Sequence, residues 1–390
     1  RFQTKKLFLI AGFLFSIGLI VDVFAQQFTL LLIGRFIQGA GVGIALPMMY
    51  IIILEESPER LLGLMMGCGS FVTAAPAIGP TFGGIMTQYF TWRYIFICVL
   101  PVIVLASFIG YFCMSEQIIN KHEKFDLLSF IAVALAFVSL IMGFSNLNQI
   151  VDDLVFVLGC FIIGIISLYY FTKRQLHIKN SLIRIEIFNH KGFTFHTLAI
   201  MFLQMTTLGY GLLLPTFVQI VLKQPATDAG VVLLPGAIVG AVFAPIGGLI
   251  LDRLGAKKPI VLGLCCSFIA TFCFLFFFKN LTYQSCILFY FIYSLGIGLI
   301  VGNTMTSAMS HLPKNLQADG NATLQTLMQL SGGIGTSITA TILAFVQQGT
   351  YLYDGTNRGA LFVLIFLMFN INIVILSQYF AFKGGKKNEF

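Results

Sequence analysis

The stretch that decides the fold lies near the start of the chain and reads Leu31-Leu32-Ile33-Gly34-Arg35-Phe36-Ile37-Gln38-Gly39-Ala40-Gly41. It is an apolar run with one charge inside it, and apolar runs of membrane-spanning length recur to the end of the chain. A helix needs about 20 apolar residues to cross the hydrocarbon core of a bilayer. We therefore interpret the chain as an all-α integral membrane protein with many spans.

The overall composition excludes a water-soluble protein. Of the 390 residues, 58% are hydrophobic and only 10% are charged, whereas about 25% are charged in an ordinary soluble domain. A soluble globule cannot hide so much apolar surface from water. The net charge of +8 does not indicate a nucleic-acid partner, because the basic residues lie in short loops and no base-reading motif is present.

Apolar runs between charged or turn-rich breaks predict about twelve membrane-spanning helices. Their approximate ranges are 7–25, 28–54, 61–88, 93–113, 127–145, 154–171, 193–220, 229–251, 258–277, 283–310, 321–347 and 359–382. Most of the 23 lysines and arginines fall on one side of the membrane, and the loops of the opposite side hold only Arg93, Lys223, Lys279 and Arg358. Because cytoplasmic loops are rich in Lys and Arg, we expect a multi-pass protein of the cell membrane with a cytoplasmic C-terminus.

Two similar basic stretches indicate an internal repeat. The chain opens with Arg1-Phe2-Gln3-Thr4-Lys5-Lys6, and the loop after the eighth predicted span contains Arg253-Leu254-Gly255-Ala256-Lys257-Lys258. Repeated halves are typical of transporters, and by symmetry we expect two further helices before Arg1, which makes about fourteen in all. The expected domains are an incomplete N-terminal bundle (1–126), an extra helix pair with a cytoplasmic linker (127–192) and a C-terminal six-helix bundle (193–390).

Arg35 stands inside a predicted span, where a charge costs about 2.5–3.5 kcal/mol at the helix centre. We interpret it as facing an internal cavity that holds a protonatable group or a ligand; the alternative is that its side chain reaches outward to the membrane surface. Gln38 lies on the same helix face. Asp22, near the external end of the first span, faces either this proton-coupling cavity or water at the interface.

Two glycine-containing motifs indicate moving parts. The first is Gly79-Pro80-Thr81-Phe82-Gly83-Gly84. Its proline kinks a helix and its glycines let a neighbouring helix approach, so we expect a gate or simple close packing. The second lies at a cytoplasmic helix–loop–helix junction and consists of Gly248, Asp252, Arg253, Gly255 and Lys257. Its charges either form an ion-pair latch between helix ends or only set the topology.

Polar side chains of the later spans are candidates for lining a substrate cavity, and they are Gln204, Asn303, Gln325 and Gln329. With many aromatic residues nearby, such a cavity suits apolar or cationic ligands, and helix packing is the alternative for each residue. No cofactor or metal is expected, since the eight cysteines form no C-x-x-C pair and no nucleotide-binding loop is present. Because no catalytic set of side chains is visible, an enzyme is not expected.

The motifs resemble those of the major facilitator superfamily. The run from Arg35 to Gly41 is similar to its motif B, Gly79–Gly84 to motif C (the antiporter motif), and Gly248–Lys257 to motif A of the second half. The extra central helix pair and the glycine-rich eleventh span resemble the fourteen-helix drug/proton antiporters, the EmrB/QacA-like group. The chain departs from these motifs at three positions, which are Gln3, Ala75 and Ala256.

The resemblance implies two six-helix bundles around a central cavity, with alternating access and proton-coupled export of lipophilic or cationic drugs. The partners it implies are a small-molecule substrate, protons and the lipid bilayer, with a periplasmic adaptor only in a two-membrane bacterium. The family's usual coupling acid, in the first helix, would lie upstream of Arg1. One alternative is a transporter of the same fold for a specific metabolite, peptide or lipid, and another is a non-transporting membrane protein.

Overall fold

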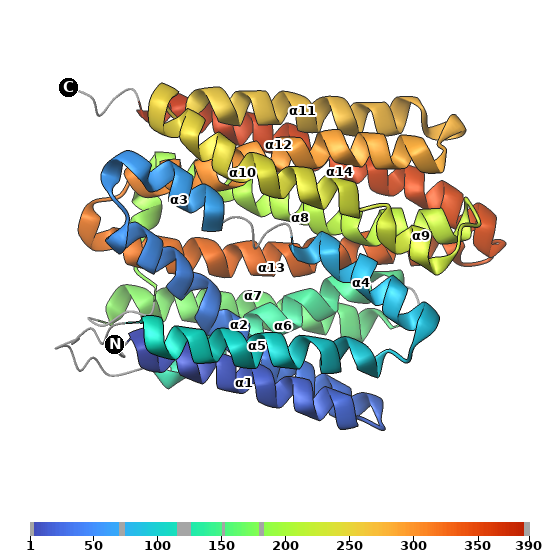
Figure 1. Cartoon of the computed structure of the whole chain (residues 1–390), viewed down its shortest axis with the longest axis horizontal. Coiled ribbons are helices and arrows are strands. Elements are labelled where there is room, and N and C mark those ends of the chain that lie inside the picture. The colour runs from blue at the N-terminus through green and yellow to red at the C-terminus, as the bar shows by residue number, and fades with distance from the viewer. Residues whose placement is uncertain (1–3, 70–74, 115–125, 150–152, 179–182, 386–390) are drawn as a thin grey trace. The chain divides into compact units, whose positions relative to one another are not determined.

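The computed structural model describes residues 4–69, 75–114, 126–149, 153–178 and 183–385, and these residues form helices joined by short connections (Figure 1). Eleven of the described helical segments are long and apolar enough to cross a membrane. The helices are α1 (Thr4–Phe24), α2 (Phe28–Glu56), α3 (Leu62–Gly69), α4 (Ala75–Tyr89), α5 (Arg93–Cys113), α6 (Leu127–Ser145), α7 (Leu154–His177), α8 (Lys191–Ile220), α9 (Ala226–Val231), α10 (Leu234–Leu254), α11 (Lys257–Phe276), α12 (Tyr283–Ser310), α13 (Lys314–Gln347) and α14 (Leu352–Gly385). The predicted all-α class with many spans is confirmed.

Among the described residues, the predicted span 61–88 is not one continuous long helix. It corresponds to the shorter helices α3 and α4, and residues 70–74 between them lie outside the described residues. The predicted span 229–251 falls within one longer candidate span, Ala226–Leu254, which joins α9 to α10. The end of α10 requires a glycine, because Gly255 adopts a φ of 80° that side chains with a Cβ rarely tolerate.

The chain divides into two compact units. The first contains residues 1–56 and 82–124, and the second contains residues 57–81 and 125–390. In the first unit, α1 packs against both α2 and α5. In the second, α12 packs against α10 and α11, α8 packs against α13 and α14, and the short α3 packs on α10 and α12. The three-domain division into 1–126, 127–192 and 193–390 stays a prediction.

The helix pair α6–α7 belongs to the second unit, where α6 packs against α7 and α13. Two hydrogen bonds fix its position on α13. The hydroxyls of Ser145 and Ser337 lie 2.8 Å apart, and the Thr341 hydroxyl donates to the backbone oxygen of Phe144 at 2.8 Å. Buried polar groups need such partners because the membrane core holds no water to replace them.

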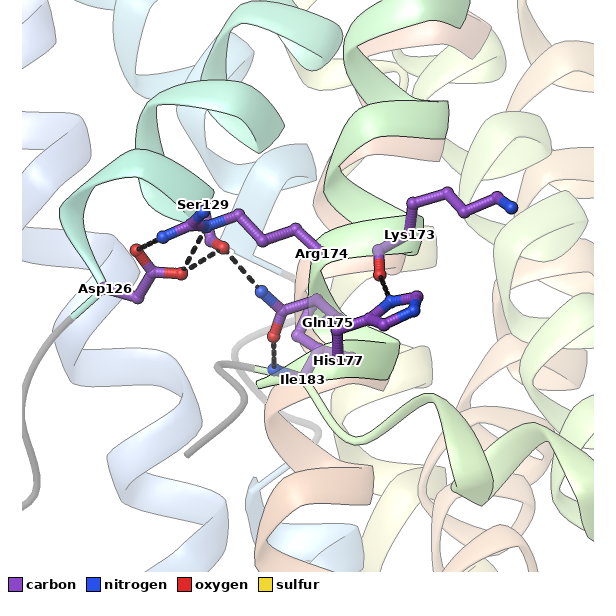
Figure 2. Close-up of polar contacts among 7 residues, drawn as sticks. All are labelled: Asp126, Ser129, Lys173, Arg174, Gln175, His177 and Ile183. Atoms are coloured by element: carbon purple, nitrogen blue, oxygen red, sulfur yellow. Dashed lines mark hydrogen bonds and ion pairs between the residues drawn. The ribbon is translucent and has the colours of Figure 1, made fainter. Parts of the chain in front are cut away.

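A polar network ties together the far ends of this pair (Figure 2). Arg174 of α7 donates two hydrogen bonds to the carboxylate of Asp126, at 2.9 and 3.1 Å, and Ser129 donates a third. The buried Gln175 donates to the Ser129 hydroxyl at 2.7 Å and accepts from the backbone N–H of Ile183 at 3.1 Å. The network therefore joins the start of α6, the end of α7 and the connection that follows.

The charge on Asp126 is favoured by its surroundings. The hydrogen bonds from Arg174, and after them the one from Ser129, hold the pKa of the Asp126 carboxyl well below its usual range. A carboxyl whose pKa is lowered on folding adds stability above its ordinary pKa of about 3.9, and that stability disappears as the pH falls toward the lowered value. The two-pronged contact also requires arginine, because lysine presents a single point charge.

We expect Asp126→Asn to lower the thermal midpoint of the purified protein at pH 7. The amide is neutral and has only one acceptor oxygen, so it cannot replace the charged carboxylate that accepts both hydrogen bonds from Arg174. The difference from the wild type should shrink as the pH is lowered toward 3. Thermal unfolding followed across this pH range tests both statements. Asp354→Asn, at the exposed start of α14, is the matched control, and an equal loss in both variants would contradict the role of the network.

Candidate functional site

Three of the predicted site residues meet in the first unit. Asp22 of α1 is fully buried, and its Oδ2 accepts a hydrogen bond of 2.6 Å from the Gln38 side chain of α2. The Arg35 guanidinium lies 3.4 Å from the same carboxylate oxygen and donates to the Gln38 amide oxygen at 3.3 Å. Asp22 therefore lies in a polar cluster with Arg35 and Gln38. Its side chain does not face water, which was one of the two alternatives that the sequence left open.

The cluster depends on a close approach of two helices. A Cβ added to Gly34 would collide with the Asp22 carboxylate, and one added to Gly18 would lie 2.6 Å from both the Gln38 side chain and the Gly34 carbonyl. Only residues without side chains let the backbones of α1 and α2 come this near. The other face of the Arg35 guanidinium lies over the ring of Phe96 from α5, 4.8 Å from its centroid.

One oxygen of the cluster lacks a partner, and the arginine of the cluster is partly exposed. Asp22 Oδ1 has no hydrogen-bond partner among the described residues, although it is buried. The Arg35 side chain, by contrast, is 55% exposed. A buried carboxylate normally costs free energy unless it is paired and hydrogen-bonded. The arrangement can therefore hold either a charged carboxylate paired with Arg35 or a protonated, neutral one.

The predicted latch contains a different contact from the expected ion pair. The two oxygens of Asp252, at the end of α10, accept hydrogen bonds from the backbone N–H groups of Gly63 at 2.9 Å and Leu64 at 3.0 Å. These groups lie in the first turn of α3, where backbone N–H groups have no partner within the helix. A carboxylate at this position also interacts favourably with the positive end of the helix dipole.

Glycines allow this contact too. A Cβ on Gly63 would lie 2.7 Å from the carbonyl oxygen of Gly248, and one on Gly248 would lie 2.8 Å from Leu64 Cα. The basic members of the predicted latch, Arg253 and Lys257, are exposed. Asp252 therefore joins α10 to α3 through backbone amides, and the glycines of both helices make room for the contact.

Two glycines of the proline- and glycine-containing motif of α4 have free space around them. A Cβ on Gly79 would meet nothing within 4 Å, and one on Gly83 would meet only Ile95, at 3.9 Å. Gly84 is half-buried, and the side chain of Pro80 lies outside the described part of the chain. A role of Gly79, Pro80, Gly83 and Gly84 in gating or in close packing stays a prediction.

The second unit contains a cavity of about 250 Å³ among α8, α10, α12 and α13. No residue that lines it is charged. The lining residues are Thr207, Leu208, Gly211, Leu212, Gly236, Ala237, Gly240, Tyr290, Tyr293, Ser294, Ile297, Gly298 and Thr336. The Tyr293 hydroxyl lies 2.9 Å from that of Thr207, and its ring packs against Tyr210 with 4.7 Å between centroids. The cavity therefore offers aromatic faces with a few hydroxyl groups.

None of the four residues predicted to line a cavity lines this one. Gln204 and Asn303 are buried in the helix packing, and the Asn303 side chain donates to the backbone oxygen of Leu299 at 2.7 Å. Gln325 is buried, and neither polar atom of its side chain has a hydrogen-bond partner among the described residues. Gln329 is exposed although it shares a helix face with Gln325. Their substrate contacts stay a prediction.

The sequence pattern did not predict that the tyrosines line a cavity. Tyr290 and Tyr293 lie in an aromatic run of α12, where they look like ordinary lipid-facing residues. The only signal for them is the small residues that follow on the same helix, Ser294, Gly296 and Gly298. Such small residues are what allow other helices to approach and enclose a space beside an aromatic ring.

Comparisons with known proteins agree with a transporter. The family model described as Major Facilitator Superfamily matches residues 1–336. The chain is 31% identical over 355 residues to an uncharacterized MFS-type transporter, YhcA, of Bacillus subtilis, covering 91% of this chain and 66% of that protein. It is also 31% identical over 347 residues to the lincomycin resistance protein LmrB of Listeria monocytogenes, covering 88% of this chain and 73% of that protein.

A more distant relative is the multidrug resistance protein B homolog of Mycobacterium tuberculosis, 25% identical over 357 residues, which are 88% of this chain and 65% of that protein. The chain thus spans less than two thirds of the length of this relative and of the first one. A solved structure of a bacterial homolog of the human lysosomal transporter Spinster matches with a TM-score of 0.61 at 15% identity, over 98% of this chain and 85% of that one. Together with the family model, this likeness confirms the predicted major facilitator fold.

We expect Gly34→Val to disrupt the packing of α1 on α2, because its side chain would enter the space of the Asp22 carboxylate. Overpacking of this kind costs about 1–3 kcal/mol. Gly39→Val in the same helix is the matched control, since a Cβ at Gly39 would meet nothing within 4 Å. The yield of monodisperse protein and its thermal midpoint measure the effect, and equal behaviour of the two variants would refute the close approach.

Asp252→Ala should weaken the attachment of α3 to α10, because two N–H groups of the first helical turn lose their acceptor. Loss of a helix N-terminal cap costs about 0.5–2 kcal/mol. The free energy of unfolding in denaturant gives the size of the loss. Lys258→Ala, an exposed position a few residues further along the chain, should change little, and a wild-type value for Asp252→Ala would show that the contact carries no stability.

Proposed function

This chain belongs to the Major Facilitator Superfamily, and we propose that it exports lipophilic or cationic compounds, drugs included, in exchange for protons. The resemblance of Gly79–Gly84 to the antiporter motif supports export. Two relatives are named for resistance, one to lincomycin and one to multiple drugs. The helix pair α6–α7 supports membership of the fourteen-helix drug/proton antiporter group, and the lysine-rich side of the membrane supports a cytoplasmic C-terminus.

The observation that carries the proposal is the burial of Asp22 against Gln38 and Arg35. Acidic side chains inside membrane spans are costly and generally functional. A proton on the Asp22 carboxylate removes its charge, so that its attraction to Arg35 is lost and the guanidinium becomes available for other partners. The carboxylate and the arginine together then form a two-state element whose balance depends on proton binding.

The substrate site that we propose is the aromatic cavity of the second unit. Tyr290 and Tyr293 present ring faces that attract cations and pack against apolar groups. The hydroxyls of Thr207, Ser294 and Thr336 supply hydrogen bonds that orient the bound compound. A cavity of about 250 Å³ is small beside the roughly 300–1,000 Å³ of most ligand sites, so it takes one ring system rather than a whole large drug.

Transport then proceeds by alternating access between the two halves of the fold. Protonation and substrate binding each lower the affinity for the other by the same coupling free energy, so a proton that enters favours release of the compound. The contact of Asp252 with the first turn of α3 is made in one conformation and broken in another. Asp22, Gln38 and Arg35 thus act in proton coupling, and Asp252 acts as the latch.

Transport into proteoliposomes tests the proposal, with ethidium as a lipophilic cation and lincomycin as a second probe. A pH gradient should drive uptake by the wild type. Arg35→Ala and Asp22→Asn should each reduce gradient-driven uptake by about tenfold or more, which corresponds to about 1.4 kcal/mol of lost coupling. Exchange of labelled for unlabelled probe without a gradient should persist in Asp22→Asn, because it needs no proton step.

Asp354→Asn is the matched control for removal of a carboxylate, because Asp354 is exposed. Gradient-driven uptake by Asp22→Asn at the wild-type rate would refute the coupling role. If the wild type moves neither probe, profiling with metabolites, peptides and lipids distinguishes a transporter with a specific substrate.

A further inference from the structure

A second hollow lies between α11 and α14, apart from the tyrosine-lined cavity. Its volume is about 660 Å³. The walls are mostly apolar, with Val261, Phe268 and Ile269 from α11 and Ile375 and Phe382 from α14. Gln378 of α14 also lines the groove, and its amide donates to the Thr304 hydroxyl at 3.1 Å. We call this hollow the α11–α14 groove. Both helices belong to the second unit and pack against each other (Figure 1).

The groove opens toward the surroundings of the protein. Val261 is 43% exposed and Ile269 is 52% exposed, although both are apolar and lie in a membrane span. From Lys257 to Ile269 the groove follows α11 for about 18 Å, at about 1.5 Å per residue. Half of the hydrocarbon core of a bilayer is about 15 Å thick. The groove therefore has the depth of a single leaflet and faces lipid.

One end of the groove is positively charged. Lys257 is the first residue of α11 and Lys383 lies in the last turn of α14, and both line the groove. Both are exposed, and neither takes part in an ion pair within the described part of the chain. The first turn of α11 has no side-chain cap, since Ala256 stands at its N-cap. Its free N–H groups add a partial positive charge at the same end.

An apolar groove that ends in two cations matches one class of membrane component. We propose that the α11–α14 groove binds an anionic phospholipid. The phosphate lies between Lys257 and Lys383, and an acyl chain lies along Val261, Phe268 and Ile375. Tyr379, which is 60% exposed and also lines the groove, sits at the headgroup level that tyrosine favours.

Charge complementarity selects an anionic lipid over a zwitterionic one. Basic pockets between membrane helices favour anionic headgroups, and each lysine near the surface strengthens binding by about fivefold. A zwitterionic headgroup brings its own cation close to both lysines and loses this gain. The groove is also separate from the substrate cavity, because the two share no lining residue.

Native mass spectrometry of the purified protein tests the proposal, with dioleoyl phosphatidylglycerol and dioleoyl phosphatidylcholine as probes. The wild type should bind one phosphatidylglycerol about ten- to thirtyfold more tightly than phosphatidylcholine, as expected for two lysine contacts. Lys383→Gln should weaken phosphatidylglycerol binding about fivefold, and the double variant Lys257→Gln/Lys383→Gln about twenty-fivefold. Neither variant should change phosphatidylcholine binding.

Two further variants separate the groove from general surface charge. Lys258→Gln removes a neighbouring exposed lysine that does not line the groove, and it should bind phosphatidylglycerol like the wild type. Cys265→Trp fills the groove from its α11 wall and leaves both lysines in place, so it should abolish binding of the lipid. A thermal scan in lipid-free detergent confirms that each variant is folded.

Equal affinity of the wild type for the two lipids would overturn the proposal. So would an effect of Lys258→Gln as large as that of Lys383→Gln, because the attraction would then be a property of the whole basic surface. Unchanged binding by Cys265→Trp would place the lipid elsewhere. None of these measurements uses transport, so their outcome is independent of the proposed exchange of protons for drugs.

Discussion

The hydrocarbon core of a membrane offers no water to a charge or to an unpaired backbone group, and this constraint bears on the polar groups that are buried in the spans. A partner inside the protein lowers the free-energy cost of burying such a group. Asp22 finds Gln38 and Arg35, whereas Asp252, at a helix end, finds the free N–H groups of α3. The two carboxylates solve the same problem with different partners, one with side chains and one with backbone.

Both solutions depend on glycine. Because lipid tails are as apolar as leucine, membrane helices gain little from burying apolar side chains against each other, and close van der Waals packing takes over. Gly18 and Gly34 bring α1 and α2 near enough for Asp22 to reach across, and Gly63 and Gly248 do the same for α3 and α10. The polar contacts and the small residues are therefore parts of one arrangement.

This coupling of packing to polarity bears on how a transporter moves. A contact built from backbone amides and glycines has few side chains to reorganise, so it can break and re-form as a unit. The tyrosine-lined cavity has the opposite character, since its aromatic rings adapt to different apolar or cationic shapes without a fixed set of charges.

The sequence by itself determined the membrane class, most of the spans and the shared face of Arg35 and Gln38, because hydropathy and helical periodicity are local properties. Only the tertiary structure decided that Asp22 joins this pair, that Asp252 caps α3, and that Tyr290 and Tyr293 enclose a cavity instead of Gln204 or Gln329. These outcomes depend on how separate helices approach one another, and at Asp22 and Asp252 that approach requires glycines on both partner helices. A single helix does not carry that information.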